Sequence, residues 1–273
     1  MPDATTKPAR SKDSVANTLI VAVTLSLVCS VLVASTAIIL QPIQQRNEDL
    51  YRQQIILDVA GLYEPGTDIA ALFQNIETRM VELANGEYAD SLSADDFDAV
   101  AAAKTTTLGL TIPGNLDMAN IRQRARFSPV YIVRNNDAIS QVILPVYGSG
   151  LWSTMYGFLS LGPDGSTIHG LRFYEHAETP GLGDQIDKPE WRNQWVNKKV
   201  FNGGDEPRIE VIRGFVNEDS DNAVYEIDGI SGATLTGRGV TNLVRYWTGP
   251  HGFGPSPAPA VGPKPPPRPQ SSR

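Results

Sequence analysis

The longest apolar stretch of the chain lies near its N-terminus. Residues 18–40 contain no charged side chain, and their only polar members are threonine, serine and cysteine. As a helix, this stretch would be about 34 Å long, enough to cross the hydrocarbon core of a membrane. A cleaved signal peptide is the alternative, because residues 34–37 are small, as a cleavage site requires. The apolar run continues through Leu40, which favours an uncleaved membrane anchor.

The pattern after the anchor predicts more helix. Residues 44–62 have helical spacing and would extend the anchor as a stalk, which Glu-Pro-Gly at 64–66 breaks. Residues 68–83 carry apolar side chains at spacings of three and four, which predicts a second helix with one apolar face. Residues 91–114 have a weak pattern, and we expect a loop with short helical turns there.

Further along the chain, the hydrophobic pattern changes to that of strands. Residues 130–133 and 139–146 are rich in β-branched and aromatic side chains, and the polar residues 135–137 between them predict a hairpin. Two more strands are expected at 154–161 and 168–174, because a Gly-Pro-Asp-Gly turn joins them.

The last third of the chain mixes short strands with helices. Residues 189–199 are predicted to form a helix. They begin with proline, which suits the first turn of a helix, and end with lysines, which the helix dipole favours in the last turn. Strands are expected at 208–213 and 223–227. Residues 236–247 have apolar side chains at i, i+3, i+4 and i+7 and predict a final helix, which the Gly-Pro pair at 249–250 ends.

A proline-rich segment follows this final helix. Nine prolines lie from Pro250 to Pro269. Proline cannot donate to a helix or a sheet ladder, so we expect this tail to be disordered or to adopt polyproline II.

Composition and charge exclude several functions. The net charge of −7 disfavours nucleic acid as a partner, because phosphate backbones attract dense lysine and arginine. Cys29 is the single cysteine and lies in the apolar anchor, so an internal disulfide and cysteine-ligated metal sites are ruled out. The three histidines are too scattered for a convincing metal site, and we expect none.

One candidate site precedes the final helix. Residues 228–234 read Asp-Gly-Ile-Ser-Gly-Ala-Thr and link an expected strand to a helix N-terminus. Small residues leave backbone N–H groups open there, and the helix dipole favours an anion. A phosphate at this place would lie beside the hydroxyl of Thr234. The alternative is an ordinary turn, in which Ser231 or Thr234 caps the helix.

Two other motifs are rich in glycine. Residues 178–183 read Glu-Thr-Pro-Gly-Leu-Gly, and their glycines would let the backbone approach a flat ligand closely. Residues 148–152 read Gly-Ser-Gly-Leu-Trp, and Trp152 could stack on a ring system. The alternatives are a surface turn for the first and a tryptophan that closes the core for the second.

Taken together and in this order, the three motifs resemble the FMN-binding domain of bacterial flavin-carrying electron-transfer subunits. In that family, Asp-x-x-Ser-Gly-Ala-Thr is the flavinylation signal. A dedicated flavin transferase uses FAD as donor and leaves FMN esterified to the last threonine, here Thr234. Ser231, Gly232 and Ala233 match the small residues that flank the protruding hydroxyl.

The wider chain is similar to one branch of this family, the C subunits of the sodium-translocating NADH:quinone reductases. The similarity covers residues 15–255 and leaves the proline-rich tail outside. Its matching stretches lie at 52–62, 76–88, 128–133, 144–161, 174–183, 228–236 and 248–255. The G subunit of the Rnf electron-transport complex shares the flavinylation signal, but it is not expected to share 77–88 or the His-Gly-Phe-Gly-Pro ending.

The resemblance implies an α+β fold, in which one transmembrane helix is followed by an FMN-binding domain with a mostly antiparallel sheet flanked by helices. The expected parts are a cytoplasmic tail (1–17), the transmembrane helix (18–40), a stalk and helical region (41–126), the FMN-binding domain (127–250) and the proline-rich tail (251–273).

The resemblance also implies a role in electron transfer. The subunit would relay electrons through covalent FMN on Thr234 within a six-subunit sodium pump of the bacterial inner membrane, with its flavin domain in the periplasm. Its partners would be the other subunits and the flavin transferase. It would bind neither NADH nor quinone itself, and no residue would act as a general base or hold a metal.

The same resemblance places the remaining residues around the flavin. Asp228 would serve the transfer reaction or shape the loop. The residues expected to border or flank the isoalloxazine ring are Glu178, Thr179, Gly181, Leu182, Gly183, Leu151 and Trp152.

Two alternatives stay open at this point. One is an Rnf-type subunit, which would differ in its partners. The other is a membrane-anchored binding or scaffold module without a redox centre, in which the Ser-Gly-Ala-Thr sequence only caps a helix.

Overall fold

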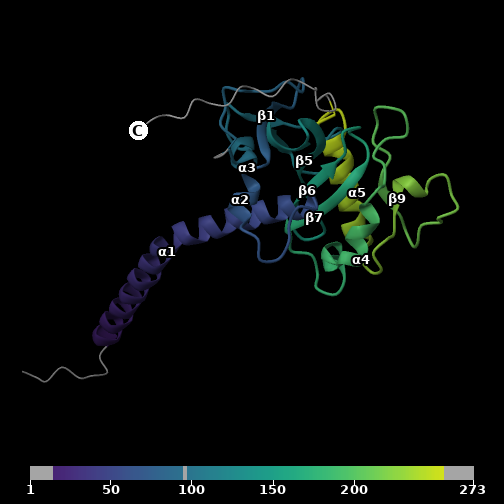
Figure 1. Ribbon diagram of the computed structural model, residues 1–273. Coiled ribbons are helices and arrows are strands. Elements are labelled where there is room, and N and C mark those ends of the chain that lie inside the picture. Colours follow the sequence, from purple (N-terminus) through teal and green to yellow (C-terminus); the bar gives the residue numbers. More distant parts are fainter. Residues whose placement is uncertain (1–14, 95–96, 255–273) are drawn as a thin grey trace, which may run out of the picture. The chain divides into compact units, whose positions relative to one another are not determined.

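The computed structural model describes residues 15–94 and 97–254 (Figure 1). The chain divides into two compact units between Leu50 and Tyr51. The first unit contains most of helix α1 (Val15–Val59), and the second contains the end of α1 and every other element.

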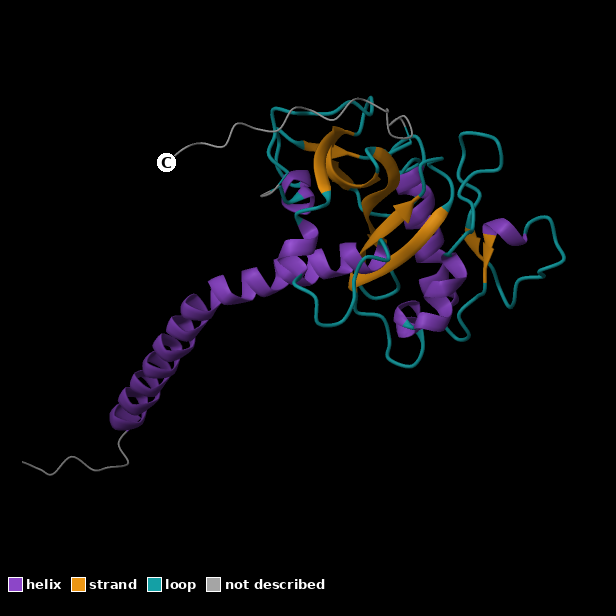
Figure 2. Ribbon diagram, in the orientation of Figure 1, coloured by secondary structure: helices purple, strands orange, loops and turns teal. Residues whose placement is uncertain are grey.

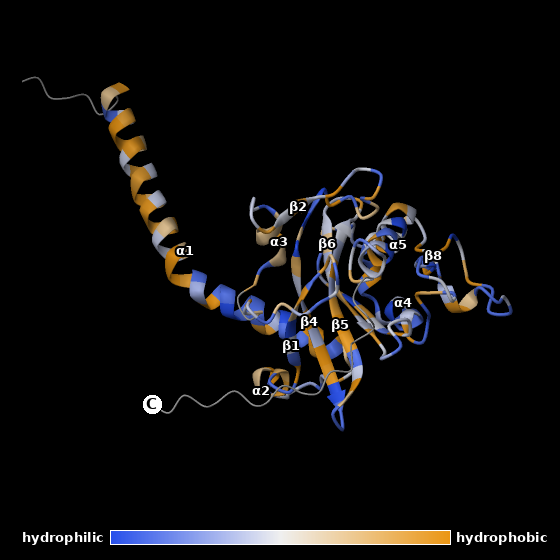
Figure 3. Cartoon of the chain, turned by 90° about the horizontal axis from the view of Figure 1, so that it is seen from above, coloured by the Kyte–Doolittle hydropathy of each residue, from blue (hydrophilic) through white to orange (hydrophobic). Residues whose placement is uncertain are grey.

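Helix α1 confirms both helical predictions for the N-terminal region. It is long and apolar enough to cross a membrane, and its side chains from Val15 to Asp49 are exposed. Figure 3 shows mostly hydrophobic residues along the N-terminal part of the helix, followed by hydrophilic residues toward the domain. The helix continues through the expected stalk and ends at Val59, two residues before Gly61, which has a φ of +70°.

The second unit is built on a five-stranded antiparallel sheet with the order β1-β4-β5-β6-β7. Figure 2 shows that the sheet is strongly curled. Its strands are β1 (Glu77–Glu82), β4 (Phe127–Asn135), β5 (Ala138–Ser149), β6 (Thr154–Leu161) and β7 (Ile168–Glu175). The last four confirm the predicted strands. Asn136 and Asp137 join β4 to β5 with φ values of +49° and +64°, as a tight hairpin turn requires.

The predicted helix at 68–83 is wrong. The structure has only a short helix, α2 (Ile69–Phe73), followed by strand β1. Met80 and Val81 are neighbours in β1, and both are buried, because elements cover both faces of the sheet. Burial on both faces removes the alternation that identifies a strand, and the remaining spacing looks helical.

Part of the region expected to be stalk and loop therefore belongs to the domain. Strand β1 pairs with β4 at the edge of the main sheet. The expected short helical turn is present as α3 (Ala99–Ala103), but we did not expect the two-stranded sheet of β2 (Gly109–Thr111) and β3 (Gln123–Ala125).

Helix α5 (Thr234–Thr248) packs on one face of the sheet (Figure 1). It begins two residues earlier than predicted. The ring of Trp247 lies 4.7 Å from that of Tyr147 in β5, and its indole N–H donates to the Tyr147 carbonyl at 2.6 Å. Gly148 lies directly beneath Leu243, where a Cβ would come within 2.6 Å of the Leu243 Cβ.

The end of α1, together with α2, covers the other face. Ile55, Ile56 and Leu57 are almost completely buried there. The rings of Phe73 and Tyr131 lie 5.9 Å apart. Both faces of the sheet are therefore covered, and the unit has a core on each side.

The remaining elements are short. They are η1 (Gly183–Asp187), α4 (Pro189–Arg192), η2 (Asn193–Trp195), β8 (Glu210–Val211), η3 (Ala223–Tyr225) and β9 (Glu226–Ile227). The expected strands at 208–213 and 223–227 are thus much shorter than predicted, and they pair in parallel. The proline-rich tail from residue 255 onward lies outside the described residues.

The predicted helix at 189–199 is also too long. Its chain leaves the helical conformation at Val196. The N–H of Asn197 then donates to the carbonyl of Ile168 at 2.8 Å, and the N–H of Ile168 donates to the carbonyl of Lys198 at 2.8 Å. Hydrogen bonding to the start of β7 therefore replaces the last turns of the helix.

The packing of α5 gives a prediction for stability. Trp247→Ala should lower the free energy of unfolding by about 3–5 kcal/mol, because it leaves a cavity in the core. Trp152→Ala is the matched control, because Trp152 is 69% exposed, and it should change that free energy by about 0.5 kcal/mol or less. Urea unfolding of the full chain in detergent, followed by near-ultraviolet circular dichroism, measures both. Equal losses would contradict this packing.

Candidate functional site

The segment that joins β9 to α5 exposes the side chain of Thr234 at its C-terminal end. Ile230 and Ala233 are buried and hold the loop against the core, whereas Ser231, Gly232 and Thr234 are exposed. Gly232 has a φ of +75°, a conformation that glycine adopts at no steric cost. The loop therefore presents Thr234 at the surface, as the first residue of α5.

The structure contradicts the alternative in which Ser231 or Thr234 caps the helix. The N-cap residue is Ala233, and no side chain makes a capping hydrogen bond. The N–H groups in the first turn of a helix have no acceptor within the helix. The positive end of α5 therefore lies beside the Thr234 hydroxyl and is suited to an anion.

Asp228 anchors the start of this loop. Its carboxylate accepts from the N–H of Val216 at 2.7 Å, and its carbonyl accepts from the indole N–H of Trp191 at 3.0 Å. Its own N–H donates to the side chain of Gln194 at 2.9 Å. These contacts place Asp228 where it shapes the loop.

The Glu-Thr-Pro-Gly-Leu-Gly motif lies against this loop. A Cβ on Gly232 would come within 2.9 Å of the Leu182 side chain. Gly181 has a φ of +79°, and the Thr179 carbonyl accepts from the N–H of Leu182 at 3.1 Å, which closes a tight turn. Residues far apart in the sequence therefore form one surface.

A buried carboxylate joins the three motifs. Glu178 is 4% exposed. One carboxylate oxygen accepts from the N–H groups of Leu151 and Trp152, at 2.8 and 3.3 Å, and the other accepts from the hydroxyl of Thr236 in α5. Glu178 therefore lies beneath the surface and holds the three segments together.

Two glycines make room for this carboxylate. A Cβ on Gly150 would come within 2.3 Å of one Glu178 oxygen, and a Cβ on Gly183 would come within 2.8 Å of the other. Gly150 and Gly183 are therefore needed because a side chain at either position would clash with the Glu178 carboxylate. This role is separate from the close approach to a ligand that the sequence suggested.

Trp152 does not close the core. Its side chain is 69% exposed, and its indole N–H donates to the Thr179 hydroxyl at 2.9 Å. The exposed apolar side chains on this surface are those of Leu151, Trp152, Leu182 and Leu235. An apolar surface beside the N-terminus of a helix suits a ligand that combines a flat ring with a phosphate, as FMN does.

Sequence reasoning missed two residues of this site. Thr236 is 1% exposed, and no signal in the sequence identified it, because its burial and its bond to Glu178 depend on the fold. Arg238 is exposed and follows Thr234 by four residues in α5, so the two lie on the same face of the helix. An arginine at this place suits a phosphate on Thr234.

Comparisons with known proteins agree with this geometry. Residues 150–249 match the family model of the FMN-binding domain. The C subunit of the Na⁺-translocating NADH-quinone reductase from Pasteurella multocida is 43% identical over 251 residues, which cover 90% of this chain and 94% of the relative. The C subunit from Pseudomonas aeruginosa is 41% identical and covers 89% of this chain and 95% of the relative.

Two solved structures share the fold. The crystal structure of NqrC from Shewanella oneidensis matches with a TM-score of 0.69 and 32% identity, covering 77% of this chain and 95% of that one. The crystal structure of the corresponding reductase component from Parabacteroides distasonis matches with a TM-score of 0.62 and 26% identity, covering 80% of this chain and 98% of that one.

The role of Glu178 is open to test. Glu178→Ala leaves two backbone N–H groups and the Thr236 hydroxyl without their acceptor. Each group that stays unsatisfied should lower the free energy of unfolding by about 1–3 kcal/mol. Deuterium uptake by residues 150–153 and 179–183 should rise several-fold. Glu190→Ala, which removes an exposed carboxylate in α4, is the control and should leave this uptake unchanged. Unchanged uptake in Glu178→Ala would show that the carboxylate does not hold the segments.

Proposed function

Since the chain belongs to the family of the C subunits of the sodium-translocating NADH-quinone reductases, we propose that it relays electrons through an FMN attached to Thr234 by a phosphoester bond. The observation that carries this proposal is the exposed Thr234 hydroxyl at the N-terminus of α5, beside an apolar surface. The family, the matched FMN-binding domain and the geometry of the loop all support it.

When bound, FMN accepts and releases electrons, and that redox chemistry belongs to the cofactor. The protein positions it. The first turn of α5 offers N–H groups to the phosphate, and Arg238 offers a positive charge one turn further along the helix. Leu182, Leu151 and Trp152 offer apolar surface to the ring. Glu178 positions the backbone of Leu151 and Trp152 through the two N–H bonds that its carboxylate accepts.

Attachment requires a reaction at the Thr234 oxygen. The oxygen attacks the phosphorus of FAD that bears the riboflavin, and a phosphoester bond forms. The bond between the two phosphates of FAD breaks, AMP leaves, and the hydroxyl proton passes to a base of the transferase. No electrons are exchanged in this step. A phosphoester bond prevents the cofactor from dissociating, which matters on an exposed surface.

The membrane arrangement is part of the proposal. Helix α1 would anchor the chain in the bacterial inner membrane, where the other subunits of the complex lie. Lys7, Arg10 and Lys12 precede the apolar segment, and Arg46 and Arg52 follow it. The slight excess of positive charge on the N-terminal side favours a cytoplasmic N-terminus, with the flavin domain in the periplasm.

The identity of the attachment residue can be tested on a denaturing gel. The full chain is coexpressed with a flavin transferase, and the unstained gel is viewed under ultraviolet light. Wild type should give a fluorescent band, and Thr234→Ala should give none, because its side chain has no oxygen. Thr234→Ser should keep part of the fluorescence, because it retains a hydroxyl. A dark wild-type lane, with an active transferase, would favour the scaffold alternative.

The orientation can be tested by cysteine labelling. In a Cys29→Ser background, Gly114→Cys places a thiol on the exposed surface of the domain, where a Cβ meets nothing within 4 Å. A membrane-impermeant maleimide should label it in cells with a permeabilised outer membrane. Ser11→Cys in the N-terminal tail is the control and should react only after lysis. The reverse pattern would place the domain in the cytoplasm.

A further inference from the structure

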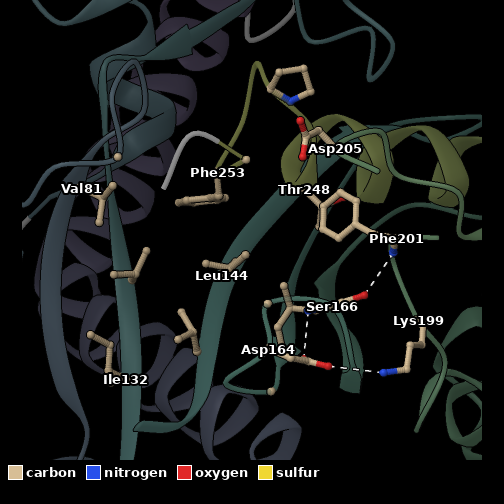
Figure 4. A pocket seen from close by; sticks show the side chains of 18 of the residues that line it. Val81, Ile132, Leu144, Asp164, Ser166, Lys199, Phe201, Asp205, Thr248 and Phe253 are labelled. Atoms are coloured by element: carbon tan, nitrogen blue, oxygen red, sulfur yellow. Dashed lines mark hydrogen bonds and ion pairs between the residues drawn. The ribbon is translucent and has the colours of Figure 1, made fainter. Parts of the chain in front are cut away.

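The second unit contains a large cavity that the proposed function does not use. Its volume is about 1060 Å³, and none of its lining residues belongs to the three motifs. Figure 4 shows Val81, Ile132 and Leu144 of the sheet on one side, and Phe201 and Phe253 facing them. The side chains of the sheet and of Phe253 on its floor are already buried, whereas Tyr88 is 37% exposed and Phe201 is half-buried. An occupant would therefore find accessible apolar surface at these two rings.

The C-terminal segment of the same chain begins at this cavity. Phe253 and Gly254 line it, and Gly254 is the last described residue. The next residues, 255–269, contain eight prolines. This segment is therefore tethered to the cavity and is present there at a high effective concentration.

The chemistry of this segment suits the cavity. Proline-rich segments in the polyproline II conformation bind to grooves lined by aromatic side chains. Tyr88, Phe201 and Phe253 supply aromatic rings here. Residues 255–261 carry no charge, and in polyproline II they would extend about 22 Å, at about 3.1 Å per residue.

The charges are complementary as well. The cavity is bordered by the carboxylates of Glu87, Asp164 and Asp205, and Lys199 pairs with Asp164 at 3.4 Å. Residues 255–269 contain Lys264 and Arg268 and no acidic side chain. Its basic residues follow the uncharged part, so they can reach the acidic border once the apolar cavity is filled.

We propose that residues 255–269 occupy this cavity of their own chain as an extended polyproline II segment. The prolines and Val261 pack on the accessible rings of Tyr88 and Phe201, and Lys264 and Arg268 face Glu87 and Asp205. Because proline restricts the free segment beforehand, binding costs little conformational entropy.

Hydrogen exchange tests this proposal on the full chain in detergent. Replacing every proline of 255–269 by glycine or serine keeps the length and charge of the tail but removes its polyproline II preference. Deuterium uptake by residues 84–88 and 199–205 should rise several-fold, as it should on truncation after Gly254. Uptake by residues 228–236 should stay unchanged. Equal uptake by all three proteins at 84–88 and 199–205 would overturn the proposal.

A disulfide experiment identifies the occupant. In a Cys29→Ser background, Gly204→Cys and Gly262→Cys place one thiol at the cavity and one in the tail. Mild oxidation should join them within one chain, and the glycine/serine tail should give several-fold less product. Products that join two chains would assign the cavity to a second copy. If the peptides lining the cavity became protected only in the assembled complex, the occupant would be a partner subunit. Either result would overturn the proposal.

Charge reversal separates docking from general damage. Lys264→Glu with Arg268→Glu should weaken the link within the chain, and so should Glu87→Lys with Asp205→Lys. Combining all four changes should restore the link. Asp221→Lys, at another exposed position, is the control and should have no effect. If the combined variant fails to recover, the proposed charge contacts are wrong.

Discussion

The hydrogen bonds accepted by the buried Glu178 carboxylate are the interactions on which the site depends. They connect the loop of Leu151 and Trp152, the turn that Glu178 begins, and the first turn of α5 through Thr236. A buried carboxylate is costly unless its oxygens are satisfied, and here each oxygen has a partner. Gly150 and Gly183 leave it the space that it needs. Trp152, Leu182 and Thr234 are thereby fixed relative to one another, although they come from distant parts of the sequence.

This local arrangement rests on the sheet and on helix α5. Packing of Trp247 on Tyr147, and of Leu243 on Gly148, fixes the helix on the sheet, and the helix in turn carries Thr234 at its N-terminus. Because Ile230 and Ala233 are buried, the short loop before the helix cannot turn inward, and its small exposed residues leave the hydroxyl accessible. An enzyme that modifies Thr234 needs such access, and a fixed cofactor needs the rigid support beneath it.

The strands from β4 to β7, helix α5 and the apolar anchor could be predicted from local patterns, because their periodicity and turn residues agree. The strand at 77–82 could not, because burial of both Met80 and Val81 hides the alternation. The helix at 189–195 and strands β8 and β9 are shorter than predicted. Where they end depends on hydrogen bonds to distant segments, which no local pattern contains. In the site, the motif around Thr234 was visible in the sequence. The burial of Glu178 and its hydrogen bond to Thr236 were not visible in the sequence, because they depend on three segments that meet only in the folded chain.

The proposed function requires that Thr234 carries the cofactor on a chain that α1 anchors in a membrane. The most direct test of this account is mass spectrometry of the tryptic peptide that spans residues 214–238, from full chain coexpressed with a flavin transferase. The account predicts that this peptide gains the mass of FMN less one water, with fragment ions that place the gain on Thr234. An unmodified peptide, or a gain located on Ser231 or on Thr236, would contradict it.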